Sequence, residues 1–194
     1  TRGLNHVRYA DDCNIYVKSE KAAQRVLTNI TKYVEETLKL RVNRDKSGTF
    51  RPRDSVFLGY TYSKANCTRI VVAQKSVKRL WAKLHKIFNT ARGTSLGWTI
   101  KAITPILRGW RNYYRLDDRK QYWEEMDQRI RHHLRKLIWI AWKKPKTRER
   151  NLVKLGIDPE RAWKSSVNGR GAWWNSGQPH MHQPTKNERF VRLG

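Results

Sequence analysis

The chain has 194 residues, of which 42 are Lys or Arg and 16 are Asp or Glu, so its formal net charge is +26. A positive charge of this size opposes compaction unless a polyanion neutralises it, which favours nucleic acid as the partner. No apolar run reaches the length of a membrane span, and the two cysteines, Cys13 and Cys67, lack the spacing of a zinc module or a disulfide scaffold.

The first predicted element is a β-hairpin whose tip carries Tyr9-Ala10-Asp11-Asp12. Apolar and polar residues alternate over 7–9 and again over 13–17, which is the period of a strand. The adjacent carboxylates of Asp11 and Asp12 repel each other, and a divalent cation removes that cost. Their hard oxygen atoms suit Mg²⁺ and phosphoryl transfer. Taken alone, the tip also fits an ordinary turn, in which Asp is common.

The next segment predicts a helix and two further strands. Ser19 is a suitable N-cap, and apolar residues recur at helical spacing from residue 23 to 38. Residues 40–42 are expected to form a short strand that runs into a turn at 43–46. Residues 55–62 are expected to form another strand, in which a glycine allows close approach of a second backbone, with residues 68–72 as its hairpin partner.

Residues 74–143 predict three helices, over about 74–89, 99–115 and 118–143. Between residues 64 and 150 there are 23 Lys and Arg against 6 Asp and Glu, a net charge of +17. The first helix has an apolar stripe opposite a basic side, and the basic side carries Lys75, Lys78, Arg79, Lys83 and Lys86. A solvated face is the alternative explanation for such a run, but this charge density favours a nucleic-acid interface.

The second helix carries Arg108, Arg111 and Arg115 at spacings of 3 and 4, so we expect them to share one face. The histidines at 132–133, 180 and 182 lack Cys or acidic partners at ligand spacing, which favours packed or phosphate-facing side chains over a metal site. After Pro145 the periodicity fades, and residues 169–174 are the most structured-looking part of the remainder.

The order of these motifs resembles the C-terminal part of a group II intron reverse transcriptase, or maturase, of the bacterial kind without an endonuclease domain. Residues 8–12 resemble the polymerase motif with catalytic aspartates, 40–47 the following palm motif, and 57–60 the primer-grip strand. Residues 107–114 (Leu-Arg-Gly-Trp-Arg-Asn-Tyr-Tyr) resemble the signature of the thumb, called domain X. Residues 169–173 and 179–182 are similar to the segment after the thumb that contacts DNA.

The resemblance implies an α+β fold. It would be the C-terminal half of a polymerase palm, with antiparallel strands and a helix (residues 1–72), then a three-helix thumb (73–146), then a small DNA-binding segment (147–194). A complete palm also needs a third carboxylate and the fingers, and none of these precedes Thr1 in the sequence. We therefore expect the chain alone to bind RNA without extending a primer.

The resemblance also implies roles for single residues. Asp11 and Asp12 are expected to hold Mg²⁺, with Mn²⁺ as the alternative, and to carry catalysis. Lys46 is expected near the phosphates of the incoming nucleotide, and Leu58, Gly59 and Tyr60 would form the primer grip. The residues expected to bind nucleic acid are basic and lie in the thumb and beyond it: Lys75, Lys78, Arg79, Lys83, Arg108, Arg111, Arg115 and Arg170.

The implied function is an RNA-directed DNA polymerase and maturase that assists intron splicing and copies the intron into DNA during retrohoming. Its expected partners are group II intron RNA, the DNA target and primer, dNTPs, and the N-terminal fingers and palm part of the same protein, with no membrane. The expected location is a cytoplasmic, nucleoid-associated ribonucleoprotein. Two alternatives remain: an RNA-binding maturase module without polymerase activity, and a defence-associated or diversity-generating reverse transcriptase.

Overall fold

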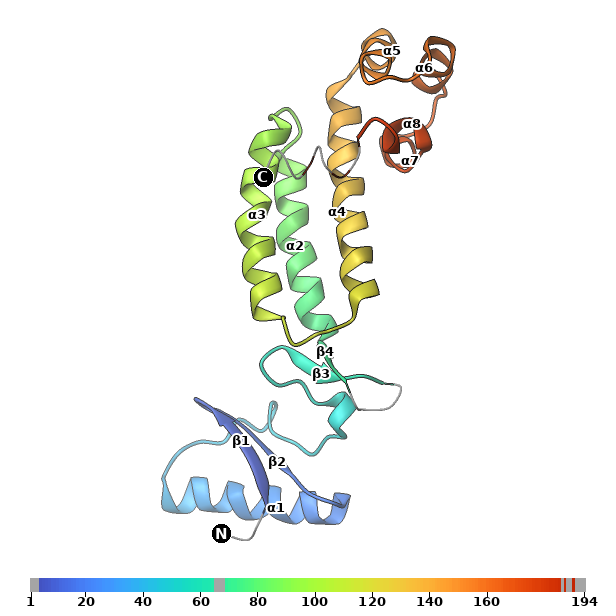
Figure 1. Ribbon diagram of the computed structural model, residues 1–194. Coiled ribbons are helices and arrows are strands. Elements are labelled where there is room, and N and C mark those ends of the chain that lie inside the picture. Colours follow the sequence, from blue (N-terminus) through green and yellow to red (C-terminus); the bar gives the residue numbers. More distant parts are fainter. Residues whose placement is uncertain (1–3, 65–68, 186, 188–189, 191–194) are drawn as a thin grey trace. The chain divides into compact units, whose positions relative to one another are not determined.

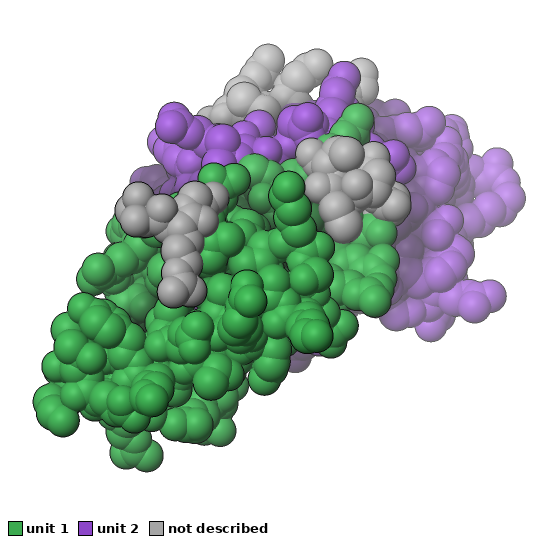
Figure 2. All heavy atoms as spheres, turned by 90° about the horizontal axis from the view of Figure 1, so that it is seen from below, with its two compact units in different colours: residues 1–73 green, residues 74–194 purple. Residues whose placement is uncertain are grey.

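The structure is a computed structural model that describes residues 4–64, 69–185, 187 and 190. It divides into two compact units, residues 1–73 and 74–194, which Figure 2 distinguishes by colour. Unit 1 contains two separate two-stranded antiparallel sheets and a helix, whereas the described elements of unit 2 are all helices (Figure 1). The expected α+β class is therefore confirmed. The finer division into three domains stays a prediction.

The first hairpin of unit 1 forms as expected. Strand β1 (Asn5–Tyr9) pairs antiparallel with β2 (Asp12–Tyr16), and Tyr9 lies opposite Asp12. The loop is therefore only two residues long, and Ala10 adopts the left-handed conformation (φ 51°) that such a reversal requires. The Nε of Arg8 donates a hydrogen bond of 2.9 Å to the backbone carbonyl of Ala10, and this bond stabilises the turn.

The helix after the hairpin also begins where the sequence predicts. Helix α1 (Glu20–Lys32) is capped by the Ser19 hydroxyl, which accepts a hydrogen bond of 3.2 Å from the backbone N–H of Ala22. It continues into a wider π-helical turn, η1 (Tyr33–Thr37). No residue of α1 is fully buried, so its apolar stripe is only partly covered.

Two strand predictions in unit 1 are wrong. Residues 40–42 form no strand, although the turn expected at 43–46 is present. Only residues Tyr60–Tyr62 of the longer predicted strand form one, β3, which pairs with β4 (Ile70–Val72). The reason lies in Leu58 and Gly59, which both have positive φ (51° and 77°) and so reverse the chain before β3. Thr68, expected in the partner strand, lies outside the described residues, as does Cys67.

The three helices predicted for residues 74–143 are confirmed in unit 2. They are α2 (Gln74–Thr90), α3 (Leu96–Tyr113) and α4 (Lys120–Ala141), which lie side by side (Figure 1). The apolar stripes of the three helices meet in one core, because each helix contributes buried residues to it. This first core contains Leu80, Leu84, Phe88, Ile100, Ile103, Met126, Ile130, Leu134 and Phe190.

Four short helices follow where the sequence showed little periodicity: α5 (Pro145–Lys154), α6 (Pro159–Ser166), α7 (Ala172–Ser176) and α8 (Pro179–His182). Three of them begin with proline, whose fixed φ suits the first turn of a helix. They build a second core around the C-terminal half of α4, with Trp139, Leu152, Ile157, Ala162 and Met181. None of the helices in the described ranges has the length and apolarity to cross a bilayer.

Candidate catalytic hairpin and nucleic-acid interface

The two adjacent aspartates lie at the tip of the first hairpin. Asp11 occupies the second position of the two-residue loop, and Asp12 is the first residue of β2. Both side chains are exposed. Asp12 lies directly across from Tyr9, so their side chains share one face of the sheet. The tyrosine remains 63% exposed beside it. The hairpin therefore presents two carboxylates and an uncovered aromatic ring at one end.

The donor chemistry of this tip fits a hard divalent cation. Mg²⁺ uses one or two carboxylates and completes its shell with water and substrate phosphates. Among the residues that the structure describes, no group of three or more His, Cys, Asp or Glu side chains forms a metal cluster. Asp11 and Asp12 would thus supply two of the ligands, and the remaining positions would be taken by other oxygen atoms.

Lys46 lies in the turn at 43–46, with an exposed side chain. Its backbone N–H donates to the carbonyl and to the side-chain oxygen of Asn43, each at 3.2 Å. The neighbouring Arg44 donates to the carboxylate of Glu35 at 2.7 Å, which attaches this turn to η1. The structure thus fixes the backbone at Lys46 while its ammonium group faces solvent.

Leu58, Gly59 and Tyr60 form a tight reversal rather than a straight strand. Phe57 and Tyr60 exchange two backbone hydrogen bonds of 2.9 Å across it, and the carbonyl of Gly59 accepts a bond of 2.8 Å from the N–H of Ala73. A primer-grip role for these three residues therefore needs a turn, whereas the sequence suggested an extended strand. Nearby on β3, burial raises the pKa of the Tyr62 phenol, and the adjacent Tyr16 raises it further.

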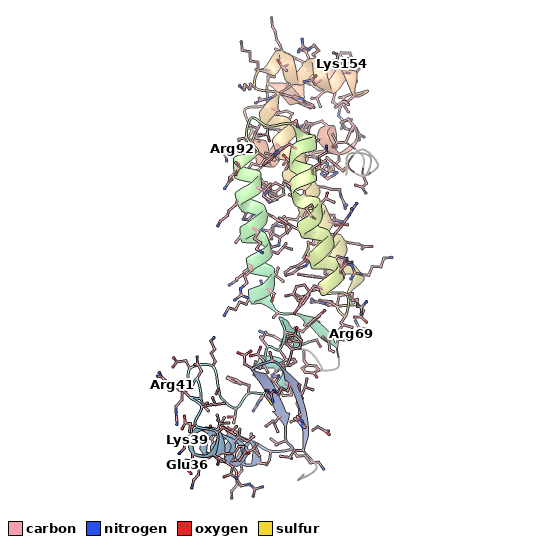
Figure 3. The ribbon with its side chains drawn as sticks, turned by 90° about the vertical axis from the view of Figure 1, so that its left-hand side faces the viewer. Glu36, Lys39, Arg41, Arg69, Arg92 and Lys154 are labelled. Atoms are coloured by element: carbon pink, nitrogen blue, oxygen red, sulfur yellow. The ribbon has the colours of Figure 1, made fainter. Side chains whose placement is uncertain are left out.

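Helix α2 separates its basic and apolar residues as the sequence predicts. Val77, Leu80, Leu84 and Phe88 are buried. The basic residues of the same helix are all exposed, and these are Lys75, Lys78, Arg79, Lys83 and Lys86. Other basic side chains of unit 2 are also exposed. Arg92 follows the C-terminal end of α2, and Lys154 lies in α5 (Figure 3). The positive charge of unit 2 thus covers much of its surface.

The expected common face of three arginines on the second thumb helix is only partly correct. Arg108 and Arg111 lie in α3, but the helix ends at Tyr113, and Arg115 lies in the turn beyond it. The side chain of Arg111 packs with its guanidinium carbon 4.5 Å from the ring centre of Trp123 in α4. Arg111 therefore bridges two helices as well as presenting charge.

A buried acid forms the corner between α3 and α4, and sequence analysis missed it. The Asp117 side chain is fully buried, and its carboxylate accepts bonds from Nε and a terminal nitrogen of Arg119 at 2.8 and 2.5 Å. These bonds raise the pKa of Arg119. The backbone carbonyl of Asp117 also accepts a bond of 2.8 Å from the indole N–H of Trp123. The only signal in the sequence was the acid–base pair two residues apart.

Arg170 lies just before α7, and it is exposed. Its backbone N–H donates to the side chain of Asn168 at 2.8 Å, and its guanidinium carbon lies 5.5 Å from the ring centre of Trp174. Trp174 is 43% exposed, so this pair offers a cation and an aromatic surface together.

The histidines of unit 2 are packed among aromatic rings. His132 stacks on Trp173 with ring centres 3.8 Å apart, and its Nε2 lies 2.9 Å from the carbonyl of Trp173. His133 stacks on Phe88 at 4.7 Å. Burial lowers the pKa of His133 to about 4, and nearby positive groups lower it too; burial does the same for His180. The rings of His132 and His133 therefore join α7 and α2 to α4, as expected for packed histidines.

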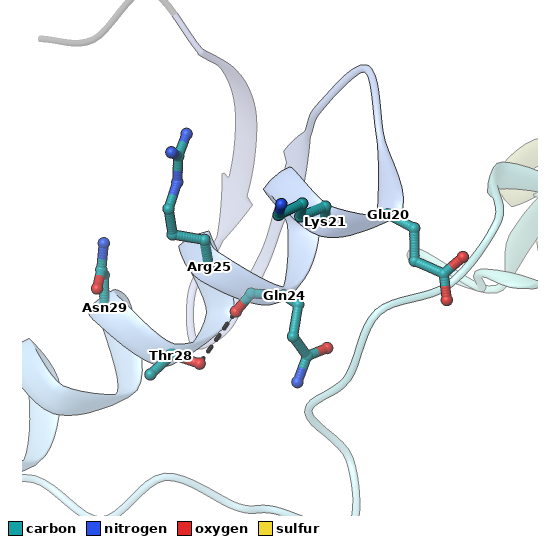
Figure 4. Close-up of a pocket in the computed structure, with 6 residues that line it drawn as sticks. All are labelled: Glu20, Lys21, Gln24, Arg25, Thr28 and Asn29. Atoms are coloured by element: carbon teal, nitrogen blue, oxygen red, sulfur yellow. Dashed lines mark hydrogen bonds between the residues drawn. The ribbon is translucent and has the colours of Figure 1, made fainter.

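A depression on α1 is lined by six polar side chains of that one helix, drawn in Figure 4. Thr28 donates from its hydroxyl to the carbonyl of Gln24 at 3.0 Å, which is an ordinary bond within a helix. The lining mixes Glu20 with Lys21 and Arg25, so it concentrates neither charge. The depression contains none of the residues expected to act in catalysis.

Comparison with protein families gives two matches in separate parts of the chain. Residues 1–62 match the family described as reverse transcriptase (RNA-dependent DNA polymerase), and this range contains the hairpin aspartates, Lys46 and the turn at 58–60. Residues 77–156 match the family described as group II intron, maturase-specific domain, and this range contains α3 and its arginines. No curated protein matches the chain. Because the two matches lie in one chain and together cover most of it, the chain belongs to the group II intron reverse transcriptases/maturases.

Proposed function

We propose that this chain provides the metal-binding hairpin and the thumb of an enzyme that copies group II intron RNA into DNA from a primer, using dNTPs. The observation that carries the proposal is the exposed Asp11–Asp12 pair at the tip of a two-residue hairpin within the reverse-transcriptase match. Bound Mg²⁺, or Mn²⁺ in its place, would supply activation of the primer hydroxyl and stabilisation of the leaving pyrophosphate.

The remaining expected residues would bind and orient the substrates. Lys46, exposed on its fixed turn, would face the triphosphate of the incoming dNTP. The reversal at Leu58-Gly59-Tyr60 would lie against the primer end. The exposed cations of α2 and α3 would hold the backbone of intron RNA or of its hybrid with DNA, which suits both splicing assistance and retrohoming. Arg170 with Trp174 would contact the DNA target.

Unit 1 leaves large apolar side chains uncovered, which supports a covering partner. Val7, Tyr9, Leu40 and Phe50 are 46%, 63%, 60% and 64% exposed. Uncovered apolar surface of this extent marks an interaction site. The partner proposed here is the fingers and the N-terminal palm part of the same protein, which would also bring the third carboxylate to the hairpin.

The experiment that tests this function is primer extension on an RNA template by the full-length protein with Asp11→Asn. We expect RNA affinity and thermal stability to stay unchanged, because Asp11 is exposed in a loop. We expect cDNA synthesis to fall by at least about 10³-fold, because a metal ligand contributes several kcal/mol of transition-state stabilisation.

Glu160→Gln is the matched control, since it removes another exposed carboxylate that is far from the hairpin in the sequence. It should leave extension unchanged. Extension by Asp11→Asn at the wild-type rate would rule out the assignment of the hairpin as the metal site.

A further inference from the structure

The turn that carries Lys46 is attached to a helix by an ion pair. A terminal guanidinium nitrogen of Arg44 lies 2.7 Å from a carboxylate oxygen of Glu35, nine residues earlier in the chain. The neighbouring pair of Lys32 and Glu36 is different, because its atoms are 3.9 Å apart and both residues belong to one continuous helical segment. The Glu35–Arg44 pair therefore joins two elements, whereas the Lys32–Glu36 pair supports only one.

Glu35 is the better shielded member of its pair. Its side chain is 33% exposed, whereas those of Arg44 and of the adjacent Glu36 are 73% and 65% exposed. A short, charge-assisted hydrogen bond to a carboxylate that is mostly out of water is stronger than a pair in full contact with solvent. The Glu35–Arg44 pair is therefore suited to hold the turn in one place.

The helix that carries Glu35 changes its geometry at this point. The segment η1 is a π-helical turn that continues α1, and its closing bond of 3.2 Å runs from the N–H of Leu38 to the carbonyl of Tyr33, five residues back. Such turns are rare, and many of them lie at functional sites. Residues 33–37 contain no proline or glycine that would impose one. Because the turn is wider than an α-helical one, Glu35 points in a direction that a regular continuation of α1 would not give it.

The chain returns from η1 towards the turn through a sharp reversal. Lys39 has a positive φ of 53°, and the N–H of Leu40 donates to a carbonyl of η1 at 3.0 Å. Within the turn itself, the amides of Lys46 and Ser47 donate to Asn43. These bonds give the turn its shape, and the ion pair attaches the shaped turn to η1.

We propose that Glu35 is a positioning residue for Lys46, and through it for the triphosphate of the incoming dNTP. Glu35 acts through Arg44, which is two residues from Lys46 in the same turn. A lysine side chain is long and flexible, so the place of its ammonium group depends on how firmly its backbone is held. This inference rests on the proposed function, in which Lys46 faces the triphosphate, and it assigns η1 a part in that function.

A direct bond from Arg44 to the triphosphate is the competing explanation, because the Arg44 side chain is 73% exposed. The two explanations differ in what the loss of each partner does. If Arg44 is a link, removal of Glu35 and removal of Arg44 have equal effects, since either one breaks the attachment. If Arg44 binds phosphate itself, its removal has the larger effect.

The test measures KM and kcat for a single dNTP, incorporated at a primer end on an RNA template by the full-length protein. Glu35→Ala should raise KM about fourfold and change kcat by less than about twofold, because a less firmly held Lys46 binds the triphosphate more weakly before the reaction. Arg44→Ala should raise KM by the same factor. Both variants should shift Tm by less than about 2 °C, because the pair is partly exposed.

Glu36→Ala is the matched control, since it removes the adjacent carboxylate, which pairs with Lys32 within the helix. It should leave KM unchanged. Lys46→Ala should raise KM by about tenfold or more, and adding Glu35→Ala to it should raise KM no further. The exchange of Glu35→Arg with Arg44→Glu re-forms the pair in the opposite sense, and it should restore KM to within about twofold of the wild type.

The outcomes separate this inference from the proposed function. If Lys46→Ala leaves KM unchanged, the role of Lys46 in the proposed function fails, and the positioning role fails with it. If Lys46→Ala raises KM but Glu35→Ala behaves like Glu36→Ala, only the positioning role is overturned. A larger KM for Arg44→Ala than for Glu35→Ala would show that Arg44 binds the nucleotide itself. An additive effect of Glu35→Ala and Lys46→Ala would show that Glu35 does not act through Lys46.

Discussion

The corner between α3 and α4 allows a quantitative test of how the thumb holds its shape. We consider Asp117→Ala, which removes a fully buried carboxylate that accepts three hydrogen bonds from Arg119, two from its guanidinium and one from its backbone N–H. Breaking a buried ion pair by removing one partner costs about 3–5 kcal/mol. The side chain of Arg119 is 34% exposed, so water can rehydrate it, and we expect the lower end of the range, about 3 kcal/mol.

For a chain of this size, 1 kcal/mol shifts Tm by about 2–4 °C. Asp117→Ala should therefore lower Tm by roughly 6–12 °C. Asp117→Asn keeps one oxygen acceptor for Arg119 and should cost about half as much. Differential scanning calorimetry of the wild type and both variants at pH 7 gives these values directly.

The matched control is the ion pair between Glu160 and Lys164, whose atoms are 2.6 Å apart but whose side chains are 76% and 73% exposed. Glu160→Ala should shift Tm by less than about 1 °C, because solvent screens exposed pairs. If Asp117→Ala also shifts Tm by less than about 1 °C, burial does not strengthen this pair, and the reasoning is wrong.

Three further predictions concern unit 2. Replacing Arg108, Arg111 and Arg115 with Gln should flatten the slope of log K against log salt for RNA binding by up to about 2–3 units, and an unchanged slope would mean that these arginines are merely solvated. The pKa of His133 is lowered to about 4 in the folded chain. Below pH 6.5 the unfolded chain therefore binds a proton at this histidine more readily than the folded chain does. The free energy of unfolding should fall as the pH is lowered from 6.5 towards 4. The urea midpoint should fall less over this pH range for His133→Phe than for the wild type. Parallel curves of midpoint against pH would contradict this. Leu84→Ala should cost about 3–4 kcal/mol in urea unfolding, because the side chain is fully buried; a cost below about 1 kcal/mol would mean that the site collapses around the cavity.

Long periodic patterns were readable from the sequence because many residues repeat the same signal. Helices α2, α3 and α4 have 17 or more residues each, so their apolar stripes are unambiguous. The N-cap at Ser19 and the hairpin were also readable, because each depends on neighbouring residues only. The aspartates at the tip could be located for the same reason.

Features that depend on few residues or on distant partners were not readable. Helices α7 and α8 have five and four residues, too few for a helical period to appear. The reversal at Leu58 and Gly59 places a leucine at positive φ, which its residue type does not favour. The burial of Asp117 depends on Arg119 and on the aromatic residues of α4 that fold over the corner. Tertiary contacts, and not local sequence preferences, determine these features.

Helix α4 takes part in both cores of unit 2, with Leu134 in the first and Trp139 in the second. The helical segment between these two residues therefore sets both the distance between the two cores and their relative rotation about the helix axis. One residue inserted there would turn the second core by about 100° and move it by about 1.5 Å relative to the first. The His132–Trp173 stack would then lose its alignment. Changes in length should be tolerated in the loops of this protein but not in these few residues of α4, where a single insertion would set the two cores out of register.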